Sequence, residues 1–219
     1  MTQQTSSATD TAAPGLRETK KRETRQLISD RATRLFLERG FEATTIADIA
    51  DAARVAKKTV TNYFPRKEDL AFDHQEEFAA GLARTVAERA PGETALAALR
   101  RSFLAAVAAQ DPVAGFAGPE FTGMIADSPT LTACLRGLHD QREDALAAAL
   151  AEATGAPAGD ITARTAAALL GAVHRVLFQR IQELTLAGHT NPEIAATLEK
   201  EAARAFDLLE PALADYARK

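Results

Sequence analysis

The segment Lys57–Tyr63 carries the side chains best suited to binding chemistry in this chain. Its sequence, KKTVTNY, offers two cations, two hydroxyls, an amide and a phenol, and no carboxylate. Such groups hydrogen-bond phosphate oxygens and base edges, so the pattern indicates nucleic-acid binding, with an ordinary polar helix surface as the alternative. The candidate contacts are Lys57, Lys58, Thr59, Thr61, Asn62 and Tyr63.

Two short helices must hold this surface in place. In the first, apolar residues at i, i+3, i+4 and i+7 predict one buried stripe, which consists of Ile46, Ile49, Ala50 and Ala53. Thr44 or Thr45 caps this helix, and Asp48 suits a capping box. The second helix directs Val60 and Phe64 inward. Neither helix is long enough to be stable alone, so both must pack on neighbouring elements.

Composition and charge bound the fold class. The 219 residues are 46% apolar, with frequent alanine and no tryptophan, which predicts an all-α protein. The formal net charge is −4, but residues 16–70 hold 13 Lys and Arg against 9 Asp and Glu. The later residues are acidic. A basic N-terminal head on an acidic body is typical of a DNA-binding domain carried by a domain that does not touch DNA.

Other classes of protein receive little support. The single cysteine, Cys134, rules out an intramolecular disulfide. No stretch approaches the roughly 18 apolar residues that span a membrane, and the N-terminus lacks the pattern of a signal peptide. We therefore expect a soluble cytoplasmic protein without membrane contact.

The chain order predicts a flexible tail (1–15), a DNA-binding domain (16–65) and a regulatory domain (66–219). About nine helices are expected in total. They cover residues 16–39, 44–53, 56–63, 67–89, 93–109, an imperfect helix within 111–127, 129–154, 160–188 and 191–217, the last with a kink at Pro211. Lys and Arg residues in the first turns of 16–39 suit DNA backbone contact.

Residues of the head match a known pattern. They are Phe36, Gly40, Phe41, Thr44, Thr45, Ile49, Ala50, Val55, Thr59, Tyr63, Phe64, Lys67 and Leu70. At this spacing the chain resembles the TetR (tetracycline repressor) family of transcriptional regulators. The resemblance implies a helix-turn-helix head and a homodimer built from the last two long helices. It also implies a repressor that a small-molecule effector releases from a palindromic double-stranded DNA operator.

The resemblance also implies roles for single residues. Thr44, Thr45 and Lys67 would meet DNA phosphates, and the recognition helix would begin at about Ala56. Two positions depart from the family. Arg54 stands where the turn usually has glycine, so it either reshapes the turn or tolerates a positive φ and reaches a phosphate. Ala56 stands where a capping serine is common.

The body offers candidates for an effector site. Aromatic, thioether and imidazole side chains in helices expected to face its centre are Phe103, Phe121, Met124, His139, His174 and Phe178. The alternative is plain core packing. Arg142 and Arg175 also need a partner, which is a ligand, a carboxylate or a second subunit.

The last two long helices carry two apolar stripes. One consists of Ala167, Leu170, Val173, Leu177 and Ile181, and the other of Ile194, Leu198, Ala202, Phe206 and Leu209. Together they favour a four-helix seam between two subunits, with packing inside one chain as the alternative.

Two rival functions remain. A helical-bundle di-iron enzyme needs Glu-x-x-His motifs, and none of the four histidines has a glutamate three residues before it. We expect no catalytic residues, metal or cofactor. A head that binds protein rather than DNA is disfavoured by the basic, carboxylate-free face.

Overall fold

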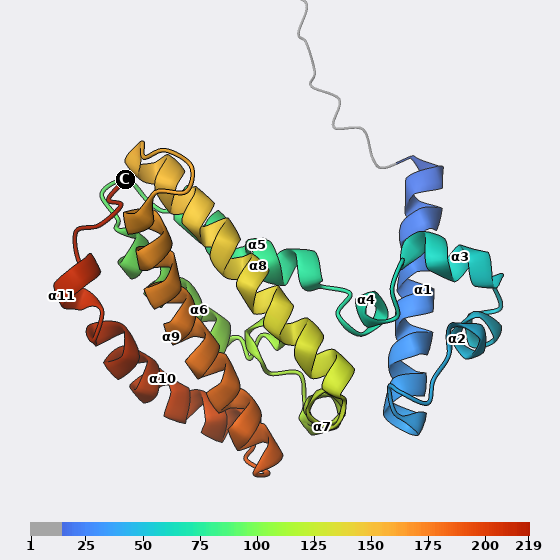
Figure 1. Ribbon diagram of the computed structural model, residues 1–219. Coiled ribbons are helices and arrows are strands. Elements are labelled where there is room, and N and C mark those ends of the chain that lie inside the picture. Colours follow the sequence, from blue (N-terminus) through green and yellow to red (C-terminus); the bar gives the residue numbers. More distant parts are fainter. Residues whose placement is uncertain (1–14) are drawn as a thin grey trace, which may run out of the picture.

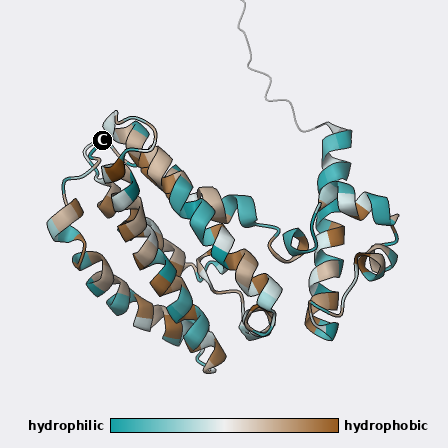
Figure 2. Cartoon of the chain, in the orientation of Figure 1, coloured by the Kyte–Doolittle hydropathy of each residue, from teal (hydrophilic) through white to brown (hydrophobic). Residues whose placement is uncertain are grey.

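The protein folds into eleven α-helices and one short 3-10 helix, as the computed structural model of residues 15–219 shows (Figure 1). Within that range there is no β-strand, which confirms the predicted all-α class. Apart from Gly15, the expected flexible tail lies outside the described residues. Figure 2 shows hydrophobic residues along the helices of the body, whereas the first turns of α1 are hydrophilic.

The head consists of α1 (Leu16–Arg39), α2 (Ile46–Ala53) and α3 (Lys57–Tyr63), at the right of Figure 1. The three helices meet around one apolar core. Its fully buried large side chains are Ile28, Phe36, Ile49, Val60, Phe64 and Leu70. Within the α2 stripe, Ile49, Ala50 and Ala53 are buried and Ile46 is partly buried, so the predicted packing of this helix is confirmed.

The N-terminus of α2 decides between the two candidate caps. Thr45 is the cap: its Oγ1 accepts from the Asp48 amide, and its own amide donates to the Asp48 carboxylate at 2.8 Å. This is the expected capping box. Thr44 is buried instead, and its hydroxyl donates to the Gly40 and Leu35 carbonyls.

The turn between α2 and α3 has the conformation that glycine favours, without a glycine. Arg54 has φ 55° and ψ 42°, which is the left-handed region. Its amide donates to Asp51 O, and the next amide, of Val55, donates to Ala50 O at 3.0 Å. Arg54 therefore tolerates the positive φ that the turn requires. Ala56 begins α3 without a side-chain cap, as expected.

The predicted single helix over residues 67–89 is wrong. It is two helices, α4 (Glu68–Ala71) and α5 (Gln75–Glu88), separated by a break at Phe72–His74. Asp73 explains the break, because it is bonded to α1 rather than to its own helix. Its carboxylate accepts from Ser29 Oγ, and its carbonyl accepts from the Arg25 guanidinium at 3.3 Å.

The body follows with α6 (Ala95–Ala108), the 3-10 helix (Pro112–Ala114), α7 (Pro119–Asp127), α8 (Pro129–Thr154) and α9 (Ile161–Leu186). The chain ends with α10 (Asn191–Asp207) and α11 (Glu210–Leu213). The predicted helix to Ala217 therefore stops earlier, and Pro211 lies in the first turn of α11 instead of forming a kink. The two breaks account for eleven helices in place of nine.

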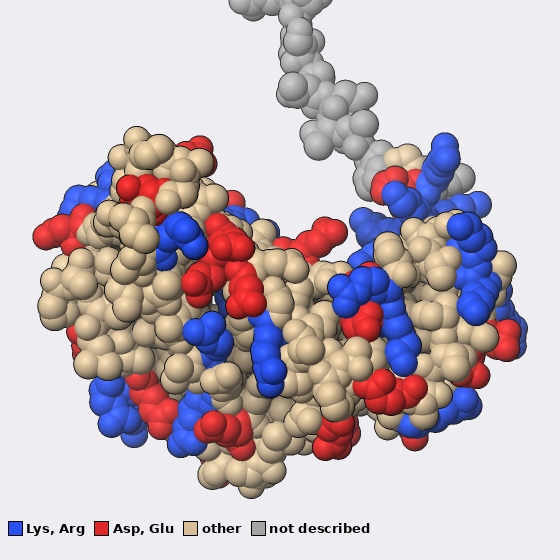
Figure 3. All heavy atoms as spheres, in the orientation of Figure 1, with Lys and Arg blue, Asp and Glu red and all other residues tan. Residues whose placement is uncertain are grey.

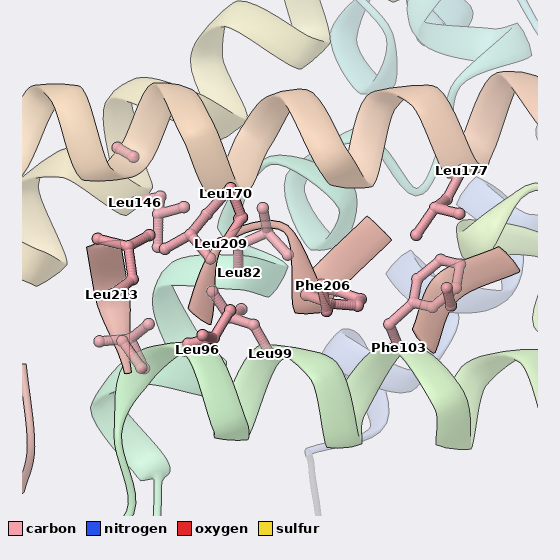
Figure 4. Close-up of a cluster of buried hydrophobic side chains, with 14 of the residues drawn as sticks. Leu82, Leu96, Leu99, Phe103, Leu146, Leu170, Leu177, Phe206, Leu209 and Leu213 are labelled. Carbon is pink, nitrogen blue, oxygen red and sulfur yellow. The ribbon is translucent and has the colours of Figure 1, made fainter. Parts of the chain in front are cut away.

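The two stripes predicted to form a seam between subunits are packed inside the chain. Leu170, Ile181, Ile194, Leu198 and Phe206 are completely buried, and all belong to one core cluster. Figure 4 shows how residues of α6 in that cluster point toward residues of α9. These stripes therefore cannot form the dimer seam, because a single body already uses them.

Another face of α9 is left uncovered. This helix is the one element of residues 15–219 that is long and apolar enough to cross a membrane, by length and composition alone. Only 39% of its most apolar 18-residue window is buried. Its inward residues pack in the core as those of a core helix do, while Leu169, Val176 and Leu186 remain 39%, 59% and 52% exposed.

The strained turn yields a stability prediction. Arg54→Gly should raise the free energy of unfolding by about 0.5–1 kcal/mol. A residue with a side chain pays an energetic cost in the left-handed region, and removing this cost outweighs the additional conformational entropy that glycine loses on folding. Chemical denaturation measures the difference. Ala52→Gly, two residues earlier at an exposed position inside α2, is the matched control and should destabilise by about the same amount. A lower stability of Arg54→Gly would contradict the strain argument.

Candidate nucleic-acid interface and body cavities

The outward face of α3 forms the candidate nucleic-acid interface. Lys57, Lys58 and Asn62 are exposed, while Val60 and Phe64 are completely buried against the head. The short helix is held by these two apolar anchors, so its polar side chains project from a fixed support. No Asp or Glu lies within α3, so the exposed face is positively charged.

The other three α3 candidates are only half exposed. Thr59, Thr61 and Tyr63 have intermediate exposure, and Tyr63 packs partly against the head core. The Thr61 hydroxyl donates to the Lys58 carbonyl at 3.1 Å, within its own helix. Lys57, Lys58 and Asn62 are thus the side chains freest to meet a ligand. Arg54, also exposed, stands beside them in the turn.

Three further predicted contacts have side chains that serve the head itself. The buried Thr44 hydroxyl is bonded to backbone carbonyls, which removes it from the expected phosphate contacts. The Thr45 hydroxyl donates to Asp48 at 2.6 Å. Lys67 Nζ donates to the carbonyls of Phe41 and Thr44 at 2.8 and 3.1 Å, and lies over the Phe41 ring. In this structure these side chains bond within the head, and the expected phosphate contacts of Thr45 and Lys67 stay a prediction.

Positive charge gathers over the head. Figure 3 shows Lys and Arg spheres clustered on the part formed by α1 and α3, whereas both signs are mixed over the body. Arg17, Lys20, Lys21 and Arg22 in the first turns of α1 are exposed. Arg25 differs, because its guanidinium lies 4.6 Å from the centre of the Phe64 ring and contacts Asp73. It joins the head to the break after α4.

A mainly apolar cavity of about 330 Å³ lies where the head joins the body. The break at Phe72–His74 forms part of its wall, together with Thr33 of α1. From the body, α5, α7, α8 and α9 contribute Phe78, Phe121, Ile125, Leu138 and Phe178. A ligand in this cavity would therefore contact the segment that connects the two domains.

A second, more polar cavity of about 240 Å³ lies between α5, α6, α8 and α9. Val113 and Phe178 line both cavities, so the two are neighbours. Arg142 and His174 line the second one, and the Nε atom of Arg142 and the Nε2 atom of His174 are buried without a hydrogen-bond partner among residues 15–219. Two unsatisfied polar groups in one cavity are unusual in a native protein.

The predicted effector contacts are only partly brought together. Phe121 lines the first cavity, Phe103 and His174 line the second, and Phe178 lines both. Met124 and His139 line neither. Met124 packs in the head core, because α7 lies between the head and the body. His139 packs edge-on between the rings of Phe78 and Phe178.

Several lining residues escaped the sequence-based list. Phe72 and Asp73 fall inside the single helix predicted for residues 67–89, so the sequence does not assign them to a cavity wall. Phe78 also lines the cavity and is absent from the predicted contacts. Arg142 carries a usable signal in the sequence, because a cation on a helix expected to face the centre of the body needs a partner. The predicted effector contacts do not include it.

The two buried histidines make the fold sensitive to acid. Burial, with the nearby charge of Arg142, lowers the pKa of His139 from 6.5 to about 4 and the pKa of His174 well below 6.5. As the pH falls from about 6.5 toward 4, the unfolded chain binds protons that the folded protein does not. The free energy of unfolding should therefore fall through this window.

Denaturant titrations at pH 7 and pH 5 measure this dependence. His139→Phe keeps an aromatic ring between Phe78 and Phe178 and should flatten the pH dependence. His189→Gln is the control, because His189 is exposed and should leave the dependence as in the parent protein. An undiminished dependence in His139→Phe would rule out His139 as a source of the acid sensitivity.

Comparison with known proteins agrees with this geometry. Residues 28–73 match the family model described as bacterial regulatory proteins, tetR family. The HTH-type transcriptional regulator TcmR of Streptomyces glaucescens is 35% identical over 92 residues, which cover 42% of this chain and 41% of TcmR. The chain thus spans about two fifths of the length of this curated relative.

Solved structures extend the likeness to the whole fold. NalD, the secondary repressor of the MexAB-OprM multidrug efflux pump in Pseudomonas aeruginosa, is 19% identical with a TM-score of 0.53, over 85% of this chain and 97% of NalD. The SmeT–triclosan complex is 20% identical with a TM-score of 0.56, over 89% and 94%. At these identities the likeness shows the fold alone. Residues 28–73 therefore carry the pattern of the tetR family of bacterial regulatory proteins, and the described helices share the fold of NalD and SmeT.

Proposed function

We propose that this protein is a sequence-specific DNA-binding transcriptional regulator, a repressor that a small-molecule ligand releases from a palindromic operator. The observation that carries the proposal is the exposed, carboxylate-free face of α3, with Lys57, Lys58 and Asn62 projecting from a helix-turn-helix head. TcmR is named a transcriptional regulator and NalD a repressor, which supports this function. Similarity to a family of regulatory proteins gives no support to an enzymatic role.

In the proposed complex α3 enters the major groove of double-stranded DNA. Asn62 is suited to adenine and a lysine to guanine, whereas Arg54, Thr59 and Tyr63 are placed to hold phosphates. The amides at the start of α2 and the basic first turns of α1 add backbone contacts. Thr44, Thr45 and Lys67 keep the two short helices in register for this contact.

The operator and the subunits share one symmetry. A homodimer presents two recognition helices, so its half-sites are separated by about one or more helical turns of DNA. The exposed face of α9 supports the pairing: Leu169, Val176 and Leu186 follow one another at seven- and ten-residue intervals, which places them along one side of a helix. A second copy of the chain would cover this apolar surface, which a soluble monomer rarely exposes.

The cavity at the junction is the proposed effector site. SmeT is described as a complex with triclosan, which supports a small-molecule ligand for this fold. A ligand that fits only one orientation of head and body shifts the population toward that orientation. Since Phe72, Asp73 and His74 line the cavity, its occupancy bears directly on the head.

The proposed domain boundary stays near residue 65, although Leu70 and Ala71 of α4 complete the head core. Residues 66–219 then form the regulatory and dimerisation domain. We place the regulator in the cytoplasm, where a bacterial operator is found. Among residues 15–219, no group of three or more His, Cys, Asp or Glu side chains could hold a metal ion.

Removing the two leading lysines tests the DNA interface. Lys57→Ala with Lys58→Ala should weaken operator binding and reduce the slope of log affinity against log salt by about 1–2, because two cations leave the interface, of which one or both neutralise phosphates. The operator is first obtained by selecting bound fragments from genomic DNA, and affinity is then measured by fluorescence anisotropy at several salt concentrations.

The control variant removes the same number of positive charges from the body. Arg136→Ala with Lys200→Ala deletes two exposed cations there and should leave the operator affinity and its salt dependence unchanged. If log affinity against log salt had the same slope for the α3 variant and for the parent protein, the assignment of α3 as the DNA-contacting helix would be wrong. Selection that enriches no palindrome would favour a protein-binding head instead.

A charge on the uncovered face of α9 tests the dimer. Val176→Glu should convert the dimer to a monomer in analytical ultracentrifugation, because a carboxylate would be buried without a partner at the seam. Leu37→Glu makes the same kind of change at an exposed position of α1, 44% exposed, and should remain dimeric. A dimeric Val176→Glu would place the seam elsewhere.

A further inference from the structure

Arg142 is a largely buried cation that forms no ion pair among residues 15–219. Its guanidinium lies 4.5 Å from the centre of the Phe78 ring, and its Nε atom is buried without a hydrogen-bond partner in the described residues. Burial lowers the pKa of Arg142 to about 10, and no carboxylate offsets this effect. The group therefore remains charged at neutral pH inside the second cavity.

The acidic residues of that cavity are engaged elsewhere. Glu77 pairs with His74 at 3.6 Å and approaches Arg84 at 4.0 Å. The Asp111 carboxylate accepts from the Val113 amide at 2.9 Å and caps the 3-10 helix. Neither forms an ion pair with Arg142. The cavity thus combines a cation without a partner, the unpartnered Nε2 of a neutral His174, and the apolar surfaces of Phe103 and Phe178.

An unpaired buried charge lowers the stability of a fold, so its presence needs a reason. A guanidinium offers five N–H donors in a fixed fork that matches a carboxylate in a bidentate manner. A cationic or neutral ligand would leave this group unpaired. An anion would satisfy it, and His174 can hydrogen-bond a second polar atom of the same ligand.

We infer that the effector is a small organic acid, with its carboxylate on Arg142 and its apolar body against Phe178, the residue shared by the two cavities. This inference rests on the proposed function, names the ligand class, and extends the proposed effector site from the junction cavity into the second cavity, which shares Val113 and Phe178 with it. The carboxylate also competes with the Phe78 ring for the guanidinium. Phe78 lies on α5, which begins immediately after the break at the head, so the acid changes a contact that is one turn from the junction.

Isothermal titration calorimetry on the full-length dimer, without DNA, tests the inference. The probes are 2-naphthoate and decanoate, each paired with its neutral amide. Binding of both acids is measured first. An acid that binds should have an affinity at least about tenfold higher than that of its amide, because the amide lacks the charge-assisted hydrogen bond. Arg142→Met should abolish this preference.

A second measurement needs no ligand. Arg142→Met should raise the melting temperature of the unliganded protein, because it replaces an uncompensated buried charge with an apolar side chain of similar length. A guanidinium with a merely structural role would give the opposite result. Arg136→Met, at an exposed position two turns earlier on α8, is the matched control and should change neither the melting temperature nor acid binding.

Three results would overturn the inference: neither acid binds, an acid and its amide bind equally well, or Arg142→Met lowers the melting temperature. The last would show that a carboxylate such as Glu77 pairs with Arg142 in solution. These outcomes are separate from the proposed function, because operator selection and its salt dependence are measured without any ligand. Failure of DNA binding with intact acid binding would overturn the function and leave the acid site standing.

Discussion

Asp73 makes the contacts that relate the head to the body. Its carboxylate accepts from Ser29 Oγ, and its carbonyl accepts from Arg25, so both bonds come from α1. Arg25 in turn lies over the ring of Phe64, the buried residue that ends α3. One short chain of contacts therefore runs from the end of α3 through α1 to the start of α5. Any rotation of α5 against the head has to break or re-form these bonds.

Local signals predicted the head well. The spacing of apolar residues predicted the inward faces of α1 and α2. The pair Thr45 and Asp48 predicted where α2 begins, and Gly40 predicted where α1 ends. All of these depend on residues a few positions apart. The resemblance, rather than a local signal, identified Arg54 as standing at a position where glycine is usual, and of the two alternatives the structure has the positive φ. The basic face of α3 follows from its own seven residues.

Where the prediction failed, the cause is a contact between distant segments. Nothing in AFDHQ ends a helix, and the break after α4 depends on Ser29 and Arg25, more than forty residues earlier. The stripes of α9 and α10 were correctly identified as buried, but the pattern does not say which surface buries them. Met124 and Phe121 lie one turn apart on α7, yet one packs into the head core and the other lines the cavity.

That division of α7 places the wall of the junction cavity directly beside the head core. Ile125 belongs to the head core and also to the cavity wall, and Leu131 of α8 is fully buried in the same core. Ser128 caps α8 and donates to Glu42 in the loop before α2, which lowers the pKa of that carboxyl. A ligand in the junction cavity would therefore contact residues that already pack in the head core, and coupling to the head would need only two discrete packings of α7.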